Sequence, residues 1–260
     1  MEDLSATESR LSTITKGKSQ RPPRILIHGS EGIGKSTFGA SAPDPIFIQT
    51  EDGLDEIDSA KFPLAKTLAE AGEQLDSLVK EDHDYKTVVI DSADWLERLI
   101  HDQVCRDSGV ETIVKAAGGY GKGYEVALTY WREIINRLDT LRNDRGMICI
   151  LVAHSKVEKF EDPESPPYDR YSPRLHKSSA ALLCEWCDAV LFATRRVRTT
   201  TTEVNGKART TATAIGKDGG ERVIRAYGGP TCLAKTRYRI TAEIPLSWGA
   251  FIDAIATSQS

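Results

Sequence analysis

The segment Gly29-Ser30-Glu31-Gly32-Ile33-Gly34-Lys35-Ser36-Thr37 is the most informative part of this sequence. It matches the pattern G-x-x-x-x-G-K-[ST], a P-loop, in which a glycine-rich loop wraps the phosphates of a nucleotide. The pattern requires a strand before it and a helix after it. The largely apolar residues 24–28 predict that strand, and a helix is expected from Lys35 onward. The sequence therefore predicts a binding site for a nucleoside triphosphate.

The residue types of the loop explain how it would hold the phosphates. Gly29 and Gly34 lack a Cβ atom, so we expect the backbone to wrap the triphosphate closely there. Successive backbone N–H groups and the helix N-terminus supply partial positive charge. Lys35 is expected to reach the β- and γ-phosphates, and the hydroxyl of Ser36 is expected to bind Mg²⁺. The expected cofactors are ATP and Mg²⁺. No N/T-K-x-D stretch for guanine is evident, which favours adenine, and GTP is the alternative.

The composition is that of an ordinary globular protein. Of 260 residues, 40% are hydrophobic and 28% are charged. No apolar run approaches the ~20 residues that a membrane-spanning helix needs, so we expect no membrane contact. We expect a flexible arm over residues 1–22, one P-loop domain over 23–242, and a C-terminal helix or tail over 243–260.

The five cysteines are an odd number in a chain with a P-loop, which favours reduced thiols in a cytoplasm. Cys184 and Cys187 form a C-x-x-C pair that could be half of a zinc site or a redox pair. No second C-x-x-C and no H-x-x-x-H accompanies this pair, which overlaps the mostly apolar run 180–186. Structural thiols on a helix are therefore the favoured interpretation.

The charge is unevenly distributed along the chain. The formal net charge is −4, yet residues 194–239 contain eleven Lys and Arg residues against three Asp and Glu residues. A basic segment on an acidic body indicates a local contact with a polyanion. A solvated basic face without a partner is the alternative.

Segments of strand and helix length alternate through most of the chain. Short buried strands are predicted over 46–48, 87–90, 147–153 and 189–194. Helices are predicted over 66–81, from a cap at Ser92 to about Gly109, after Tyr124, and through Leu183. Continuous apolar strands that alternate with helices are typical of parallel sheets covered on both faces.

Three segments interrupt this alternation. Residues 115–124 are rich in glycine and predict a flexible loop, and residues 157–174 predict a long proline-rich loop. From Arg195 the chain becomes rich in threonine, with turns at Asn205-Gly206 and Asp218-Gly219-Gly220, which predicts hairpins. The predicted fold class is α/β: a P-loop core with a mostly parallel sheet flanked by helices, plus a C-terminal antiparallel β-hairpin extension over 195–240.

The run Thr87-Val88-Val89-Ile90-Asp91 predicts a buried strand that ends in a carboxylate beside the P-loop. An aspartate in this position holds Mg²⁺ in P-loop NTPases. We therefore expect Ser36 and Asp91 to hold the metal. In many ATPases the general base follows this aspartate directly, but here the next residue is Ser92.

Another candidate base follows the second strand. The run Phe47-Ile48-Gln49-Thr50-Glu51-Asp52-Gly53-Leu54-Asp55 resembles the phenylalanine-isoleucine-acid-x-glutamate-x-x-leucine-aspartate run of RecA-like recombinases. The glutamate of those proteins orients the attacking water, and the resemblance implies this role for Glu51. The alternative is that Glu51 and Asp52 are solvated acids of a loop.

Two further stretches extend the resemblance. Ile150-Leu151-Val152-Ala153-His154 resembles the RecA-like strand whose last residue senses the γ-phosphate, with His154 where a glutamine is usual; a structural histidine is the alternative. Ala234-Lys235-Thr236-Arg237 resembles the A-K-x-R stretch of DnaB-type helicases and phage RecA-like ATPases. There the Lys and Arg enter the nucleotide site of a neighbouring subunit, which implies that role for Lys235 and Arg237. Ordinary exposed basic residues are the alternative.

Over about residues 22–242 the chain resembles the phage AAA-type nucleotide-binding family that includes RecA-like single-strand annealing proteins. The resemblance implies a RecA-like ATPase of a phage or prophage in the bacterial cytoplasm. It also implies a homo-oligomeric ring or filament that binds single-stranded DNA, with a single-strand-binding protein as a further partner.

In RecA-like relatives the loops after the third and fourth strands hold DNA, and these positions correspond to residues 115–124 and 157–174 here. The first loop combines phosphate neutralisation with stacking surfaces, through Lys115, Tyr120, Lys122 and Tyr124. The second loop contains five acidic residues, which argues against strong phosphate contact there.

The leading functional hypothesis is a Mg²⁺-dependent ATPase that binds single-stranded DNA and promotes annealing or recombination. A DnaB-like helicase or helicase loader shares the same core. A nucleotide-dependent assembly module without hydrolysis is the non-enzymatic alternative.

Overall fold

The computed structural model describes residues 13–17, 21–204, 207–216 and 220–259. The strands of its main sheet are, in chain order, β1 (Arg24–Gly29), β2 (Pro45–Gln49), β3 (Ala60–Lys61), β4 (Thr87–Asp91), β5 (Ile148–Phe160), β7 (Ala189–Arg195), β10 (Arg222–Arg225) and β12 (Ile244–Pro245). Two further strands each pair with one member of this sheet: β6 (Tyr168–Pro173) with β5, and β11 (Lys235–Thr236) with β7.

The strand order across the sheet is β12-β10-β7-β1-β5-β4-β2-β3. All strands from β7 to β3 are parallel to their neighbours. At the other edge, β10 runs antiparallel to β7, and β12 runs antiparallel to β10. The predicted α/β class with a mostly parallel sheet is therefore confirmed.

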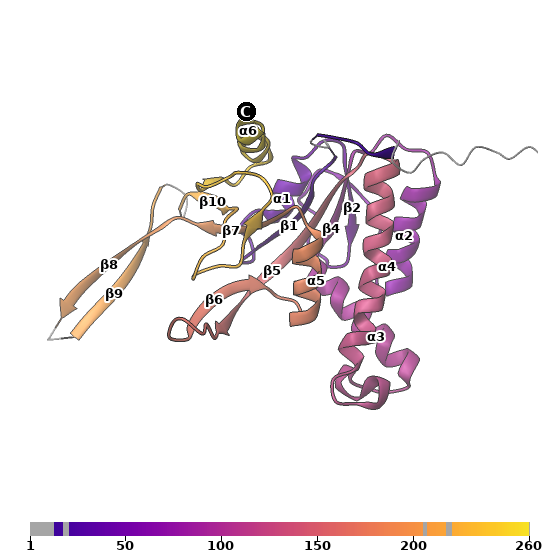
Figure 1. Ribbon diagram of the computed structural model, residues 1–260, viewed down its shortest axis with the longest axis horizontal. Coiled ribbons are helices and arrows are strands. Elements are labelled where there is room, and N and C mark those ends of the chain that lie inside the picture. The colour runs from indigo at the N-terminus through magenta and orange to yellow at the C-terminus, as the bar shows by residue number, and fades with distance from the viewer. Residues whose placement is uncertain (1–12, 18–20, 205–206, 217–219, 260) are drawn as a thin grey trace, which may run out of the picture.

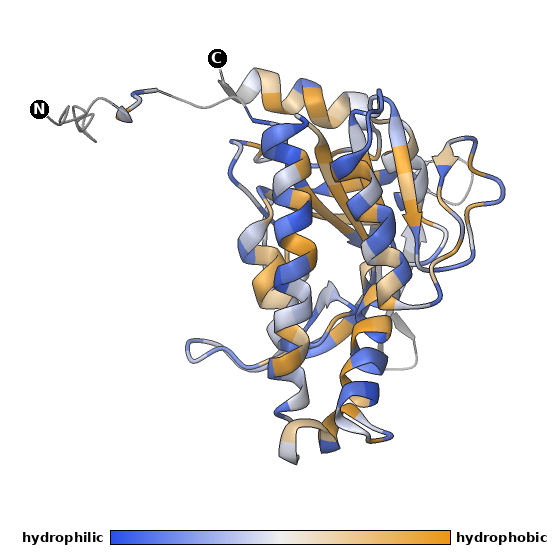
Figure 2. Cartoon of the chain, turned by 90° about the vertical axis from the view of Figure 1, so that its right-hand side faces the viewer, coloured by the Kyte–Doolittle hydropathy of each residue, from blue (hydrophilic) through white to orange (hydrophobic). Residues whose placement is uncertain are grey.

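Helices cover both faces of the sheet (Figure 1). One face packs against α2 (Leu68–Lys80), α3 (Ala93–Ser108), α4 (Gly123–Asp144) and α5 (Lys177–Trp186), and the other packs against α1 (Lys35–Ala40) and α6 (Trp248–Gln259). Successive strand residues point to opposite faces, so along β1 Leu26 joins the first core while Ile25 and Ile27 join the second. The hydrophobic strands between amphipathic helices are visible in Figure 2.

Local signals explain where several helices begin and end. The hydroxyl of Thr67 accepts the backbone N–H of Glu70 at 3.2 Å, and the Glu70 carboxylate accepts the N–H of Lys66 at 2.7 Å, which caps the start of α2. α3 ends at Gly109, which has a φ of 61°. Ser92 precedes α3 as predicted, but its hydroxyl makes no cap and bonds to Glu51 instead. Among the described residues, none of these helices has the length and apolar character to cross a bilayer.

The proline-rich segment predicted as a loop over 157–174 is a β-hairpin. β5 continues past the main sheet to Phe160 and pairs with β6, so that Phe160 lies opposite Tyr168. The guanidinium of Arg170 lies 4.0 Å from the ring centre of Phe160. Aromatic and cation–π contacts of this kind stabilise paired strands. Three of the four prolines in this segment, at positions 163, 166 and 167, lie in the turn between the two strands, and Pro173 is the last residue of β6.

The glycine-rich segment predicted as a loop over 115–124 is also more ordered than expected. A short 3-10 helix, η2 (Ile113–Gly118), fills its first half, and α4 begins at Gly123. Gly123 has no room for a side chain, because a Cβ atom there would lie 2.2 Å from the carbonyl oxygen of Ile113. Of the predicted flexible loop, only residues 119–122 lie outside a helix. They connect η2 to α4 at the end of the molecule where α3 ends and α4 begins (Figure 1).

The predicted hairpin extension consists of β8 (Val197–Val204) and β9 (Lys207–Ala214), which form a separate two-stranded antiparallel sheet. This pair projects from the body of the molecule (Figure 1). The predicted turn at Asn205-Gly206 lies outside the described residues, as do Asp218 and Gly219 of the second turn. After the hairpin the chain returns to the main sheet as β10, so the last part of the expected extension completes the core.

Candidate nucleotide site at the carboxyl ends of the parallel strands

The strand register gathers the predicted site residues at one edge of the sheet. Gly29 at the end of β1 is paired with His154 in β5, and Asp91 at the end of β4 is paired with Val152 and Gln49. A cavity of about 470 Å³ opens over this edge, where ligands commonly bind in open α/β sheets. It is lined by Glu31, Gly32, Gly34, Lys35, Ser36, Thr37, Glu51, Gly53, Leu54, Glu56, Ile57, Asp91, Val152, His154 and Arg222.

The P-loop needs its glycines for two different reasons. Gly32 and Gly34 have φ angles of 66° and 111°, in the left-handed region that favours glycine. Gly29 is required by a neighbouring strand, because a Cβ atom there would lie 2.4 Å from the carbonyl oxygen of Ala193. Gly29 thus meets a structural requirement that the sequence did not indicate. Its role is to let β1 and β7 approach.

Lys35 lies on the floor of the cavity. Its ammonium group donates to the carbonyl oxygens of Gly29 at 3.2 Å and Ser30 at 2.8 Å, and the residue is buried. Burial lowers the pKa of Lys35, an effect that the carboxylate of Asp91 and three other acids oppose. The side chain is thus held at the head of the loop, where the phosphates of a nucleotide would pass.

Asp91 and Ser36 form a site that fits a hard divalent cation. Ser36 lies beside the buried Asp91 carboxylate in the cavity and favours its charged form. The second carboxylate oxygen, Oδ2, has no hydrogen-bond partner within the described part of the chain. Burial raises the pKa of Asp91, against the opposing effects of Ser36 and Lys35. Mg²⁺ prefers one or two carboxylates plus substrate phosphates and water, so this pair of oxygen donors with an unsatisfied acceptor suits it.

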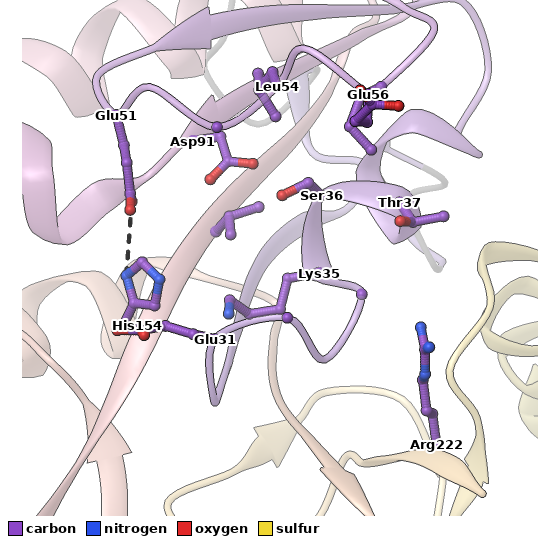
Figure 3. Close-up of a pocket in the computed structure, with 15 residues that line it drawn as sticks. Glu31, Lys35, Ser36, Thr37, Glu51, Leu54, Glu56, Asp91, His154 and Arg222 are labelled. Carbon is purple, nitrogen blue, oxygen red and sulfur yellow. Dashed lines mark ion pairs between the residues drawn. The ribbon is translucent and has the colours of Figure 1, made fainter. Parts of the chain in front are cut away.

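Glu51 lies across the cavity from the P-loop, immediately after β2 (Figure 3). Its Oε2 atom accepts a hydrogen bond from the Ser92 hydroxyl at 2.9 Å and lies 3.7 Å from Nδ1 of His154. These contacts hold the carboxylate at the rim, where it faces the cavity and is partly exposed. The structure therefore brings Glu51, Asp91 and His154 together, as the sequence predicted.

His154 is fixed by two residues that the sequence did not point to. Its Nδ1 lies 3.1 Å from Oδ2 of Asp94, and its backbone N–H donates to Oδ1 of the same residue at 3.0 Å. Arg174 donates to Asp94 at 2.7 Å and lies 3.6 Å from Glu31 in the P-loop. Burial alone would raise the pKa of Asp94, but the hydrogen bonds from His154 and Arg174 outweigh it and hold this pKa below its usual range. The only sequence signal for Asp94 was its position as an acidic residue in the first turn of α3.

Lys235 and Arg237 lie away from the cavity of their own chain. β11 pairs with Val190 and Ala189 at the start of β7, whereas Ala193, further along β7, lies beside the P-loop. Both side chains reach the carbonyl oxygen of Glu185, at 3.5 Å and 3.3 Å. The guanidinium of Arg237 also pairs with Asp188 at 3.1 Å. The two side chains thus share a direction, and only Lys235 belongs to β11.

The residues expected to contact DNA divide into two groups. Lys115, Tyr120 and Lys122 are exposed, and Tyr120 is 100% exposed. Tyr124 instead stacks on His176, with ring centres 3.8 Å apart and planes 3° from parallel. Because this face of the ring is occupied, Tyr124 anchors the start of α4 against α5 and does not offer that face to a base.

The C-x-x-C pair belongs to the helical layer on one side of the sheet. Cys184 lies in α5, and Cys187 directly follows this helix and is fully buried. Burial raises the pKa of both thiols, to about 11 for Cys184. Both pack against the first hydrophobic core, which agrees with the interpretation as structural thiols.

A profile of the family described as "AAA domain" matches residues 21–238. Among curated proteins, the SPbeta prophage-derived uncharacterized protein YorG of Bacillus subtilis (strain 168) is 26% identical over 154 residues. The aligned region covers 58% of this chain and 46% of that protein, so the match spans a little under half of the relative. Among solved structures, the crystal structure of the RadB recombinase is similar with a TM-score of 0.46 and 12% identity, over 88% of this chain and 90% of that chain.

Proposed function

The chain belongs to the AAA domain family and is a P-loop ATPase, and on this premise we propose that it assembles as a ring or filament, binds single-stranded DNA and promotes annealing or recombination. The observation that carries the catalytic part is the convergence of Lys35, Ser36, Glu51, Asp91 and His154 on one cavity. The prophage origin of the relative YorG supports a setting in a bacterial host.

In the proposed reaction, the backbone of the P-loop and Lys35 neutralise the charge of the β- and γ-phosphates. Mg²⁺, when bound between Ser36 and Asp91, adds charge stabilisation on the transferring phosphoryl group. Glu51 orients the attacking water, and the hydroxyl of Ser92 fixes the carboxylate for this task. Catalysis in this scheme depends on positioning and electrostatic stabilisation, as is typical of phosphoryl transfer.

His154 is proposed to sense the γ-phosphate and to pass its loss to the β5–β6 hairpin. The support is its bonding: Asp94 links His154 to Arg174, and the N–H of Arg174 donates to the carbonyl oxygen of His154 at 2.7 Å. Arg174 directly follows β6 and also pairs with Glu31 of the P-loop. A change at the phosphate would therefore act on both ends of the hairpin through contiguous contacts.

The assignment of Glu51 predicts a specific kinetic defect. Glu51→Gln keeps the shape and can still accept from Ser92, but it cannot act as a base. We expect kcat to fall about 10²-fold or more, with the affinity for ATP unchanged. The measurement is steady-state phosphate release together with equilibrium binding of ATP.

Asp52→Asn is the matched control, because it removes the same charge from the exposed neighbouring residue. We expect this variant to hydrolyse ATP at the wild-type rate. Wild-type turnover in Glu51→Gln, or an equal loss in both variants, would contradict the role of Glu51.

The DNA-binding part of the proposal rests on the exposed segment at the far end of α3 and α4. Lys115 and Lys122 supply positive charge there, and Tyr120 supplies an exposed ring for stacking. We expect the double variant Lys115→Ala/Lys122→Ala to bind oligo-dT more weakly. Its salt dependence should flatten by about 1.4 in log–log slope, since each phosphate contact contributes ~0.7 on single strands. Fluorescence anisotropy over a series of salt concentrations measures both quantities.

The control variant removes two positive charges from a different part of the surface. Lys80 lies at the end of α2, and Lys86 lies just before β4. Both side chains are exposed, at the end of the helical layer opposite to Lys115 and Lys122. Lys80→Ala/Lys86→Ala should bind oligo-dT with the wild-type salt slope. An unchanged slope in the Lys115/Lys122 variant would remove this segment from the DNA-binding surface.

A further inference from the structure

The nucleotide cavity has a cationic side chain that none of the sequence motifs contains. Arg222 is the first residue of β10 and lines the cavity from the wall opposite Glu51 and His154 (Figure 3). One of its terminal guanidinium nitrogens lies 3.2 Å from the position that a Cβ atom on Gly34 would take. Arg222 is therefore in contact with the P-loop itself, although nearly two hundred residues separate the two in sequence.

Among the residues that the structure describes, Arg222 has no acidic partner, unlike Arg196 and Arg225 close by. Arg196 pairs with Glu221 at 2.7 Å and with Glu243 at 3.1 Å, and Arg225 pairs with Glu243 at 2.7 Å. Within the described residues, no ion pair or hydrogen bond involves the guanidinium of Arg222. The acidic side chains at this edge of the sheet thus pair with Arg196 and Arg225, and the charge of Arg222 faces the cavity.

The backbone of Arg222 is held firmly, so this presentation is built into the sheet. Its strand pairs with β7 on one side and with β12 on the other. The carbonyl oxygen of Arg222 accepts the N–H of Leu246 at 3.0 Å, and the Leu246 side chain also lies beside Gly34. The fixed backbone places the arginine at the cavity, and its planar guanidinium suits the geometry of a phosphate.

The position of Arg222 indicates which end of the nucleotide this residue would contact. Glu51, Asp91 and His154 mark the end at which the terminal phosphate reacts, whereas Arg222 lies beyond Gly34 and Thr37 at the other end (Figure 3). The loop holds the phosphates between these ends. We infer that Arg222 is a nucleotide-binding residue that pairs, from within the same chain, with the non-transferring α-phosphate.

This inference rests on the proposed binding of ATP at the P-loop. It predicts a ratio of ATP to ADP affinities that differs from the ratio expected of a residue at the γ-phosphate. ATP and ADP both carry the α-phosphate, so a residue that contacts it stabilises the two nucleotides equally. A residue at the γ end would favour ATP alone. The ratio of the two affinities therefore separates Arg222 from a cation that acts on the γ-phosphate.

The experiment measures equilibrium binding of fluorescently labelled ATP and ADP to the full chain in the presence of Mg²⁺. We expect Arg222→Ala to weaken both nucleotides by about tenfold and by the same factor, since a hydrogen-bonded ion pair of this kind contributes that much to affinity. Arg222→Lys should recover part of the loss. Arg198→Ala, which removes an exposed arginine from the projecting hairpin, should bind both as the wild type does.

The thermal unfolding of the variants without nucleotide accompanies the binding measurement. Unfolding of Arg222→Ala at the wild-type temperature, together with recovery in Arg222→Lys, supports a direct contact. Wild-type affinity in Arg222→Ala, or a loss confined to ATP, would overturn this inference while leaving the P-loop site intact. Failure of the wild type to bind either nucleotide would overturn the proposed function, and with it the role of Arg222.

Discussion

Asp91→Asn should abolish Mg²⁺-dependent hydrolysis of ATP, with a loss of about 10³-fold or more. A bound metal ion stabilises the transition state by several kcal/mol, and each ~1.4 kcal/mol corresponds to a tenfold change in rate. The asparagine keeps the shape of the side chain but removes the anionic oxygen that has no hydrogen-bond partner among the described residues. Phosphate release at saturating ATP, over a titration of Mg²⁺, measures the effect.

The same substitution should leave the protein at least as stable as the wild type when Mg²⁺ is absent. Burial raises the pKa of Asp91, so the folded state carries an unfavourable charge at neutral pH that an amide does not. Because the folded pKa is raised, this cost is present above it and disappears as the pH falls through the ordinary aspartate range. The stability advantage of Asp91→Asn should therefore shrink on acidification. Inactivity that comes with lower stability at neutral pH would contradict a metal-binding role for Asp91.

Arg237→Ala is expected to lower kcat by about 10³-fold if Arg237 completes the nucleotide site of a neighbouring subunit. The structure offers a competing explanation, because Arg237 pairs with Asp188 within its own chain. That pair contributes little to stability: the Arg237 side chain is 56% exposed, and Asp188 retains Arg24 and Arg142 as partners. Exposed ion pairs contribute at most about 1 kcal/mol, so a purely structural role predicts a small shift in unfolding and no kinetic defect.

Mixed oligomers distinguish action between subunits from action within one. Arg237→Ala has an intact cavity, and Glu51→Gln has an intact Arg237. Mixing the two inactive variants creates interfaces at which a normal cavity faces a normal Arg237. We expect phosphate release to recover partly on mixing. Full activity of Arg237→Ala alone, or no recovery in mixtures shown by sizing to contain both variants, would defeat the assignment.

The strands and their functional ends could be predicted from the sequence because the signals there are local. The run of β-branched residues before Asp91 is a buried strand, and the glycine pattern at 29–34 requires a strand on one side and a helix on the other. Parallel strands place their carboxyl ends at one edge. For this reason Lys35, Glu51, Asp91 and His154, which are far apart in sequence, could be expected together.

The parts that could not be predicted depend on contacts between distant segments. Arg222 enters the cavity only because β10 returns to the sheet beside β7 after the projecting hairpin, and no local pattern encodes this return. Asp94 and Arg174 become linked through His154 in the same way. Prolines suggested a loop over 157–174, but three of them lie in the turn and Pro173 is the last residue of β6, so the two strands can pair up to Phe160 and Tyr168.

The proposed function requires that the P-loop holds ATP with Mg²⁺ and that hydrolysis takes place in the cavity above β1, β4 and β5. The decisive measurement is phosphate release by the wild type and by Lys35→Ala, each with Mg²⁺ and with excess chelator. We expect release by the wild type only with Mg²⁺, and none above background from Lys35→Ala. Equal hydrolysis by the two proteins would show that the P-loop is not the site of the reaction.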